Sequence, residues 1–285
     1  MFGKIDVRHN STTIVWVILV LAIFIFSVTK GIVQLNPNIL MLMFVCFFCE
    51  LMDSSLGMGY GTTLTPILLA IGYEPLQIIP TILVSEFLSG MSASVFHHRA
   101  GNVRFVKKSL DTRVALVLAA GSIVGVIIGV NLAVQIPKFY LKLIIGIIIT
   151  LAGVIIWIYV NRSFSYKRWK MVSIASVASF NKALSGGGYG PLLTAGQVLS
   201  GIPGKASVAI TSFAESFTCL VGATLFLLKG QHITLELLIP VCAGALLSVP
   251  ISANIVRNLN EIILKRSIAI VTIGLGIFTL INTIF

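Results

Sequence analysis

One glycine-rich passage occurs twice in this chain, both times inside strongly apolar sequence. The Gly-Met-Gly-Tyr-Gly of residues 57–61 returns as the Gly-Gly-Gly-Tyr-Gly of residues 186–190, at a shift of 129 positions. The same shift, without a gap, places Glu86 over Glu215, and each of these carboxylates lies in an apolar stretch. Duplicated units that hold a broken helix and an intramembrane carboxylate are typical of secondary transporters. The repeat therefore predicts two related membrane units.

The composition places most of the chain in a lipid bilayer. Hydrophobic residues make up 57% of it and charged residues 10%, whereas soluble domains carry about 25% charged residues. The formal net charge is +11, but the Lys and Arg residues stand in loops between apolar stretches, where they set membrane orientation. We therefore expect a polytopic membrane protein that does not bind nucleic acid. The first apolar run, 13–33, is predicted to be a retained transmembrane helix and not a cleaved signal peptide.

Apolar stretches predict the helices of an all-α fold. The long stretches cover residues 13–33, 38–56, 75–98, 112–134, 138–160, 169–184, 204–228, 235–256 and 262–285. Two shorter helical pieces, 62–72 and 191–201, follow the glycine-rich passages. Because a full crossing takes about 20 residues, each short piece is half of a span or a strongly tilted crossing. Residues 1–37 would then supply an extra helix, followed by one repeat over 38–160 and another over 161–285, in a single membrane domain.

The distribution of Lys and Arg predicts how the chain lies in the membrane. Most of the 20 basic residues fall in the N-terminus, in 99–113, in 161–170 and around 257–266. By the positive-inside rule these segments are cytoplasmic, and the C-terminal Phe285 lies outside. The loop after the first Glu-bearing helix is then inside, whereas its repeat partner, 229–235, is outside. The two repeats are thus predicted to have inverted topology, with glycine-broken half-helices.

The two glycine-rich passages form the predicted substrate site. Each Gly destabilises a helix by roughly 1 kcal/mol relative to Ala, and in a bilayer the freed backbone groups need partners from protein or from a water-lined cavity. The half-helix after each break would direct its N-terminal N–H groups at an anion. Lys182 would add a full positive charge at the second passage, where the first has Asp53. The predicted substrate-binding residues are Gly57, Gly59, Tyr60, Gly61, Lys182, Ser185, Gly186, Gly187, Gly188, Tyr189 and Gly190.

Simpler interpretations of the same residues stay open. Glycine also permits the close packing of membrane helices, without any ligand. Tyr60 and Tyr189 either line the site with their hydroxyl groups or pack as buried aromatics with one satisfied O–H. The sequence alone does not choose between these alternatives.

Glu86 and Glu215 are interpreted as the only acidic residues deep inside the predicted spans. A charge at the bilayer centre costs about 2.5–3.5 kcal/mol on insertion scales, so such residues are functional by default. In one hypothesis they couple transport to a proton or another cation. In a second, one of them pairs with Lys182 or Lys205; in a third, a protonated Glu bonds to a helix backbone.

No motif of an enzyme or of an ATP-driven pump is present. The chain has no nucleophile elbow, no His-Glu-x-x-His and no phosphate-binding loop. Cys46 and Cys49 lie mid-span without further zinc ligands, so we expect small apolar packing residues, no metal and no cofactor. His97 and His98 are predicted to cap the end of their helix, with a proton relay as the alternative. The chain is therefore predicted to be a carrier driven by an ion gradient or the membrane potential, and not an enzyme.

Three stretches carry a resemblance to a known family. They are Leu56 through Pro66 and Gly72 to Pro75, the basic loop His98-Arg99-Ala100-Gly101-Asn102-Val103, and Ser185 to Pro191 with Gly201-Ile202-Pro203 and Thr211-Ser212. In these stretches the chain resembles the TauE/SafE-type sulfite exporters, a family of membrane permeases. The likeness covers nearly everything after residue 38 and leaves out the helix at 13–33. It implies transport of a sulfur-containing anion, such as sulfite, thiosulfate or an organosulfonate, across the cytoplasmic membrane.

The predicted function is that of a secondary transporter for a small anion, with proton coupling through Glu86 and Glu215 as one hypothesis. The main alternative is a carrier or channel for a small cation that uses these two carboxylates. Each glycine-rich passage also contains the Gly-Tyr-Gly of potassium filters, and a homodimer, which the sequence permits, would supply four such loops. Inverted copies would not align four carbonyl rings, however, which argues against a filter. Replacing Lys182 by Ala separates the anion hypothesis from the cation hypothesis.

Overall fold

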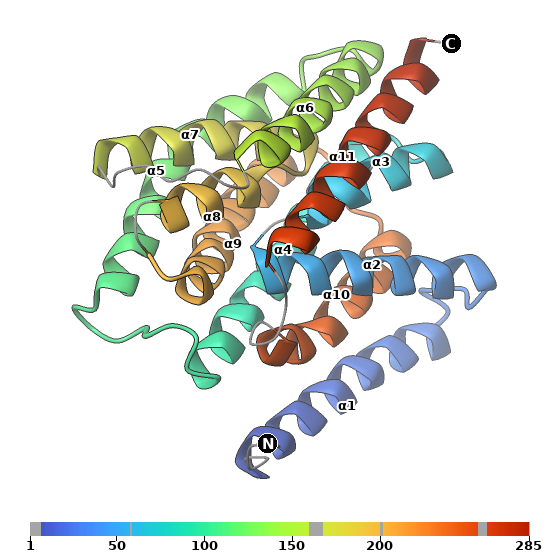
Figure 1. Ribbon diagram of the computed structural model, residues 1–285. Coiled ribbons are helices and arrows are strands. Elements are labelled where there is room, and N and C mark those ends of the chain that lie inside the picture. The colour runs from blue at the N-terminus through green and yellow to red at the C-terminus, as the bar shows by residue number, and fades with distance from the viewer. Residues whose placement is uncertain (1–6, 58, 160–167, 200–201, 256–260, 285) are drawn as a thin grey trace.

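The fold is all-helical throughout the part of the chain that the structure describes. The computed structural model describes residues 7–57, 59–159, 168–199, 202–255 and 261–284, and no strand occurs among them. Its helices are α1 (Val7–Thr29), α2 (Pro37–Leu56), α3 (Tyr60–Ile71), α4 (Pro75–Arg99), α5 (Leu110–Ala133), α6 (Lys138–Tyr159), α7 (Arg168–Ser185), α8 (Tyr189–Leu199), α9 (Gly204–Leu228), α10 (Leu235–Ile255) and α11 (Glu261–Ile284) (Figure 1). These bounds confirm the predicted sequence of long and short helices.

Helix ends follow local sequence signals. The Asn36 side chain caps α2 by accepting a hydrogen bond from the Ile39 N–H at 2.9 Å, and Pro37 occupies the first turn, where its missing N–H costs nothing. The same helix ends at Gly57, whose φ of 69° is left-handed. The largest difference from the prediction is at α1, which begins at Val7 because the polar residues before 13 continue the helix.

The repeat is visible in the helix bounds. A shift of 129 positions maps α4 on α9 residue for residue, and it maps the end of α2 and the start of α3 on the end of α7 and the start of α8. Packing partners are exchanged in the same way: α2 packs on α10 while α7 packs on α5, and α4 packs on α9 while α6 packs on α11. Two units related by a two-fold axis would show this exchange. Their inverted orientation in the membrane stays a prediction.

The extra helix α1 lies at the edge of the molecule, beside α10 (Figure 1). One of its attachments is Trp16, whose indole N–H donates to the Leu246 carbonyl at 3.0 Å and whose ring lies edge-on to that of Phe96, with 5.8 Å between the ring centroids. Much of its remaining apolar surface is exposed in this single chain, as in Ile18 and Phe26. A lipid-facing helix is expected to look like this.

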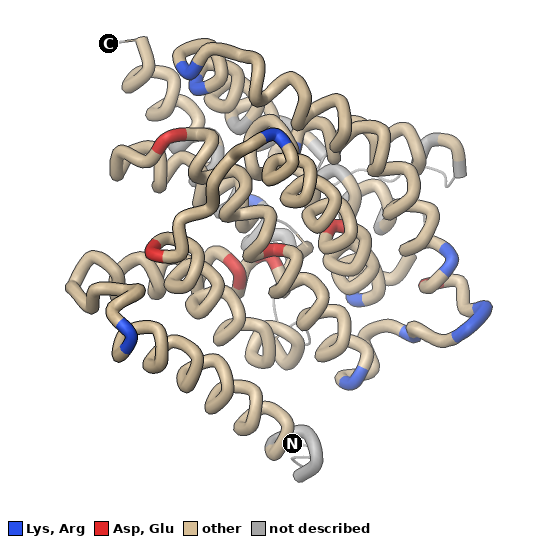
Figure 2. Tube along the Cα trace, turned by 180° about the vertical axis from the view of Figure 1, so that it is seen from behind, with Lys and Arg blue, Asp and Glu red and all other residues tan. Residues whose placement is uncertain are grey.

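Length and hydropathy support a membrane location. Among the described residues, α2, α4, α5, α9, α10 and the part of α1 from Ser11 to Thr29 are long and apolar enough to cross a bilayer. Figure 2 shows most Lys and Arg segments at the ends of helices and in loops, whereas several Asp and Glu segments lie in the middle of the helical body. Several acidic residues therefore lie in the interior, whereas most of the basic residues do not.

Candidate functional site

The two glycine-rich passages meet each other in the interior. We call residues 57–61, between α2 and α3, the first break, and residues 186–190, between α7 and α8, the second break. A Cβ atom added to Gly61 would collide with the backbone of Gly186, and one added to Gly187 would collide with the backbone of Gly61 and Thr62. Backbone thus touches backbone at this point, which only glycine permits. Close packing therefore explains Gly61 and Gly187 without a ligand.

Other glycines of the breaks are required by backbone conformation. Gly57 and Gly59 have φ angles of 69° and 127°, and Gly186 and Gly188 have φ angles of 75° and 82°. Residues with a Cβ atom rarely adopt these backbone angles, so glycine is needed for the chain to turn from one helix into the next half-helix. Gly190 lies buried in the first turn of α8. Backbone conformation and close packing therefore account for the described glycines of the breaks. Met58, Gly201 and the side chain of Pro191 lie outside the described residues.

A threonine from each half-helix lies beside the opposite break. The Thr194 hydroxyl donates to the Gly57 carbonyl at 2.8 Å. Thr65, at the same repeat position, lies beside Gly186, and its buried hydroxyl oxygen makes no hydrogen bond with any described residue. Each break is therefore contacted by a threonine of the opposite half-helix, but only Thr194 forms a hydrogen bond there.

A buried ion triad lies next to the second break. The Lys182 ammonium on α7 forms ion pairs with Glu86 on α4 and with Glu215 on α9, the latter at 2.7 Å. Lys182 is 0% exposed, and the two carboxylates are 3% and 5% exposed. We call these three residues the Lys182 triad. Pairing with Lys182, one of the three hypotheses for the carboxylates, is the one that the structure shows; Lys205 is exposed at the start of α9 and is not the partner.

The same backbone position carries opposite charges in the two repeats. The Lys182 carbonyl accepts the Gly186 N–H at 2.8 Å, and the Asp53 carbonyl accepts the Gly57 N–H at 2.6 Å. The Asp53 carboxylate also accepts the Tyr60 N–H, at 3.4 Å, at the start of α3. The partial positive charge of that half-helix therefore faces a carboxylate that belongs to the protein.

The two break tyrosines are buried and hydrogen-bonded. The Tyr60 hydroxyl lies 2.8 Å from the Ser85 hydroxyl, and the Tyr189 hydroxyl lies 2.8 Å from the Ser122 hydroxyl. Both tyrosines are 0% exposed. Of the two interpretations left open above, packing aromatics with a satisfied O–H is the one that this geometry favours. Ser185 is likewise satisfied locally, since its hydroxyl donates to the Gly187 carbonyl at 3.1 Å.

Two buried carboxylates are not recognised as such from the sequence: Glu50 is absent from the predicted site residues, and Asp53 is named only as the repeat partner of Lys182. Glu50 is 1% exposed and Asp53 is 7% exposed, so the interpretation of Glu86 and Glu215 as the only acidic residues deep in the spans is wrong. The reason is that α2 ends at the first break, which packs against the second break in the interior, so that its last turns are buried by protein. The signal was present, because both residues fall inside the apolar stretch 38–56.

His97 joins α2, α4 and α10 near the end of α4. Its Nε2 atom lies 2.8 Å from the Ser54 carbonyl, and the Asn102 amide donates to its Nδ1 at 3.0 Å and to the Ala253 carbonyl at 3.1 Å. An Nδ1 that accepts leaves the ring proton on Nε2, where it donates to Ser54. Contrary to the prediction from the sequence, the ring therefore does not cap α4; it contacts α2 and the Asn102 side chain, which explains Asn102 in the basic loop.

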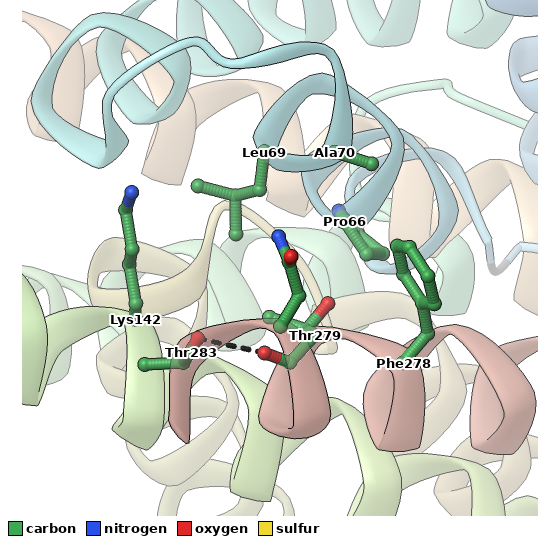
Figure 3. A pocket seen from close by; sticks show the side chains of 8 residues that line it. Pro66, Leu69, Ala70, Lys142, Phe278, Thr279 and Thr283 are labelled. Atoms are coloured by element: carbon green, nitrogen blue, oxygen red, sulfur yellow. Dashed lines mark hydrogen bonds between the residues drawn. The ribbon is translucent and has the colours of Figure 1, made fainter. Parts of the chain in front are cut away.

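A pocket lies elsewhere in the molecule, between α3, α6 and α11. Figure 3 shows Leu69, Pro66 and Ala70 of α3 across from Lys142 of α6 and from Phe278, Thr279 and Thr283 of α11; Asn282 completes the lining. The Thr283 hydroxyl donates to the Thr279 carbonyl at 2.7 Å. None of the predicted site residues lines this pocket, so the buried centre and the pocket are separate features.

Comparison with known proteins gives a consistent picture. The model of the family described as "Sulfite exporter TauE/SafE" matches residues 42–279. A curated relative, the "Probable membrane transporter protein YtnM" of Bacillus subtilis (strain 168), is 26% identical over 255 residues, which cover 84% of this chain and 81% of that protein. No solved structure matches. The match begins inside α2 and leaves out α1, as the resemblance in the sequence implied.

Proposed function

The chain belongs to the sulfite exporter TauE/SafE family of membrane transporters, and from that premise we propose that it carries a small, sulfur-containing anion across the cytoplasmic membrane. Sulfite, thiosulfate and organosulfonates are the substrates that the family and a buried ammonium group favour. The observation that carries the proposal is the buried Lys182, which lies where the two breaks meet. A buried ammonium group is the natural partner of an anion that leaves water.

In this proposal the anion and two carboxylates compete for Lys182. With Glu86 and Glu215 both ionised, the Lys182 triad has a net charge of −1 and repels an anion. When both carboxylates bind protons, the triad has a net charge of +1 and attracts one. Anion binding and proton binding then favour each other, because each ligand shifts the same equilibrium. Proton coupling follows from this competition, with Glu86 and Glu215 as the coupling residues.

The two repeats would provide access to the site from alternate sides. Lys182 and its partners are buried, so an anion reaches them only after one repeat moves against the other. The proposed units are 38–160 and 161–285, with inverted topology and α1 outside them. The N-terminus would lie in the cytoplasm and the C-terminus outside.

Chemical labelling tests this orientation. The four native cysteines are buried, so a membrane-impermeant thiol reagent should leave the unmodified protein largely unlabelled. Lys107 and His232 are exposed in the two loops that the repeat relates. In intact cells we expect the Lys107→Cys variant to stay unlabelled and the His232→Cys variant to react. Labelling of both variants from the same side would contradict the inverted arrangement.

Transport itself is tested in proteoliposomes. We expect saturable uptake of labelled sulfite, thiosulfate or a small sulfonate, driven by an imposed pH gradient. Lys182→Ala should abolish it, whereas Lys205→Ala, which removes an exposed lysine, should not. Flux of potassium or sodium without any anion flux, retained in Lys182→Ala, would overturn the proposal and favour the carboxylates as cation ligands.

A further inference from the structure

Glu50 on α2 is a buried acid that the competition at Lys182 does not use. Its Oε1 accepts a hydrogen bond from the Ser54 hydroxyl at 2.5 Å, and its Oε2 accepts one from the Ser89 hydroxyl at 3.0 Å. Both serines are themselves 1% exposed. The carboxyl group is therefore held by two neutral hydroxyls, one from its own helix and one from α4.

The four buried carboxyl groups differ in how well their charge is balanced. Glu86 and Glu215 touch Lys182, and Asp53 accepts the N–H at the start of α3. No basic side chain of the described residues forms an ion pair with Glu50. The titratable groups that face it are Cys46, Cys49 and Asp53 on α2, Tyr60 on α3 and Glu86 on α4. Every one of these is neutral or negative, so an ionised Glu50 would be an uncompensated buried charge.

Charge counting leads to the same residue. Among the residues that the structure describes, the buried charged side chains are Glu50, Asp53, Glu86, Glu215 and Lys182, together with the neutral His97. One lysine balances one carboxylate, so the other three carry protons when this centre is neutral. Glu50 is the carboxyl group that we expect to be protonated most readily, because it alone has only hydroxyl partners. A hydroxyl can donate to a carboxylate or accept from a carboxylic acid, so Ser54 and Ser89 suit both states.

The second repeat shows that packing does not require an acid at this position. Ser179 stands where Glu50 stands in the first repeat, and Thr218 stands where Ser89 stands. Both are buried: Ser179 donates to the Ser176 carbonyl at 3.0 Å, and Thr218 donates to the Ala214 carbonyl at 3.0 Å. A neutral hydroxyl therefore fills the related site. A second observation points to an exchangeable ligand: the Glu86 Oε1 atom, one turn from Ser89 on α4, is buried and makes no hydrogen bond with any residue that the structure describes.

We propose that Glu50 binds a proton that is transported together with the anion and that exchanges with the Lys182 triad at Glu86. Glu50 and Glu86 lie near each other across the α2–α4 contact, and the open Oε1 of Glu86 is the atom that receives the proton. The proton moves between two carboxyl oxygens, as an O–H bond forms on Glu86 while one breaks on Glu50, with no other reactant. This inference rests on the proposed function, since it names a further proton site for the same transport.

The first test does not depend on transport. Infrared absorption of the purified protein at neutral pH should show a band of protonated carboxyl groups. In Glu50→Gln the band should lose the share of one group, and in Glu74→Gln it should be unchanged, because Glu74 is partly exposed beside Lys138. An unchanged band in Glu50→Gln would overturn the proposal, whatever the transport assays show.

The second test separates proton drive from anion movement. With the membrane potential held at zero, a gradient of one pH unit supports about tenfold accumulation per coupled proton, an energy of about 1.4 kcal/mol. We expect accumulation driven by this gradient to fall about tenfold in Glu50→Gln, the share of one coupled proton. Anion counterflow, which exchanges labelled for unlabelled anion without a gradient, should be kept. Ser179→Ala, the matched control in the second repeat, should keep both.

Two results for Glu50→Gln would decide against the proposal. Full gradient-driven accumulation in Glu50→Gln would overturn the proposal, and so would loss of counterflow at an unchanged thermal midpoint, which would place Glu50 in the anion path. If the variant is unstable, Glu50→Asp takes its place: this variant keeps a titratable group and must retain gradient-driven accumulation. Absence of any anion flux in the unmodified protein would instead contradict the proposed function. The infrared result does not depend on transport, so it tests the proton on Glu50 separately from the proposed function.

Discussion

The two breaks share a backbone but not a charge. Each turns through left-handed glycines into a half-helix, each packs against the other, and each follows a residue whose carbonyl caps the turn. That residue is Asp53 in the first break and Lys182 in the second. The first half-helix therefore faces a carboxylate of the protein, while the second lies beside an ammonium group. The glycines that both breaks share determine the fold of this region, whereas Lys182, which only the second break has, would bind an anion.

Removing Lys182 should have the largest effect. Lys182→Ala leaves two buried carboxylates without their partner, and breaking a buried ion pair from one side costs about 3–5 kcal/mol. We expect the thermal midpoint to fall strongly and anion transport to be lost. Thermal unfolding and proteoliposome uptake measure the two effects.

A neutralised triad separates stability from binding in that variant. Replacing Lys182 by Ala together with Glu86→Gln and Glu215→Gln removes the unpaired charges, so stability should largely return. Transport should not. If the neutralised protein transported anions normally, the charge at Lys182 would have no role in binding, and the contrast between the breaks would have no functional meaning.

Crowding the contact between the breaks should come next. Gly61→Ala places a Cβ atom on the backbone of Gly186, and overpacking of this kind costs about 1–3 kcal/mol, occasionally more. Gly274→Ala is the control, because a Cβ atom there meets nothing within 4 Å. We expect a lowered thermal midpoint for the first variant only. Equal midpoints would show that the breaks do not touch as the structure has them.

Neutralising Asp53 should make the first break more similar to an anion site. Asp53→Asn keeps an oxygen acceptor for the Tyr60 N–H and removes a group that can carry a negative charge near Lys182 and Glu215. Anion affinity should rise by about fivefold, which corresponds to roughly 1 kcal/mol. Equilibrium binding of a labelled sulfonate measures it. A fall in affinity would mean that Asp53 helps to bind the anion or its counter-ion.

The tyrosines should give the smallest effect, and an equal one. Tyr60→Phe and Tyr189→Phe each remove one buried hydrogen bond, worth about 1 kcal/mol. The transport KM should not change, because neither hydroxyl is free for a ligand. A KM that rises tenfold in one variant alone would restore that tyrosine as a substrate contact.

Much of the fold could be predicted because its signals are local. Apolar length, loop charge and the exact repeat of glycines fix the helices, and the bounds of α4 and α9 differ little from the predicted ones. The ion-pair partner of Glu86 and Glu215 could not be predicted. The triad joins residues from three helices, and residue spacing along one helix does not show which side chains of other helices it contacts. Glu50 was missed because its burial comes from other helices, such as α4 with Ser89, and the sequence of α2 alone does not show which helices cover it.

The central claim is that an anion replaces carboxylates at Lys182, and the pH dependence of binding tests it most directly. The ligand should be a small sulfonate, whose own charge does not change near neutral pH. Binding requires protonated Glu86 and Glu215, so affinity should rise as the pH falls and weaken as the pH rises. In the Glu86→Gln, Glu215→Gln double variant affinity should be high at every pH, and in Lys182→Ala it should be absent. Unchanged binding in Lys182→Ala, or binding by the unmodified protein that strengthens as the pH rises, would contradict the account.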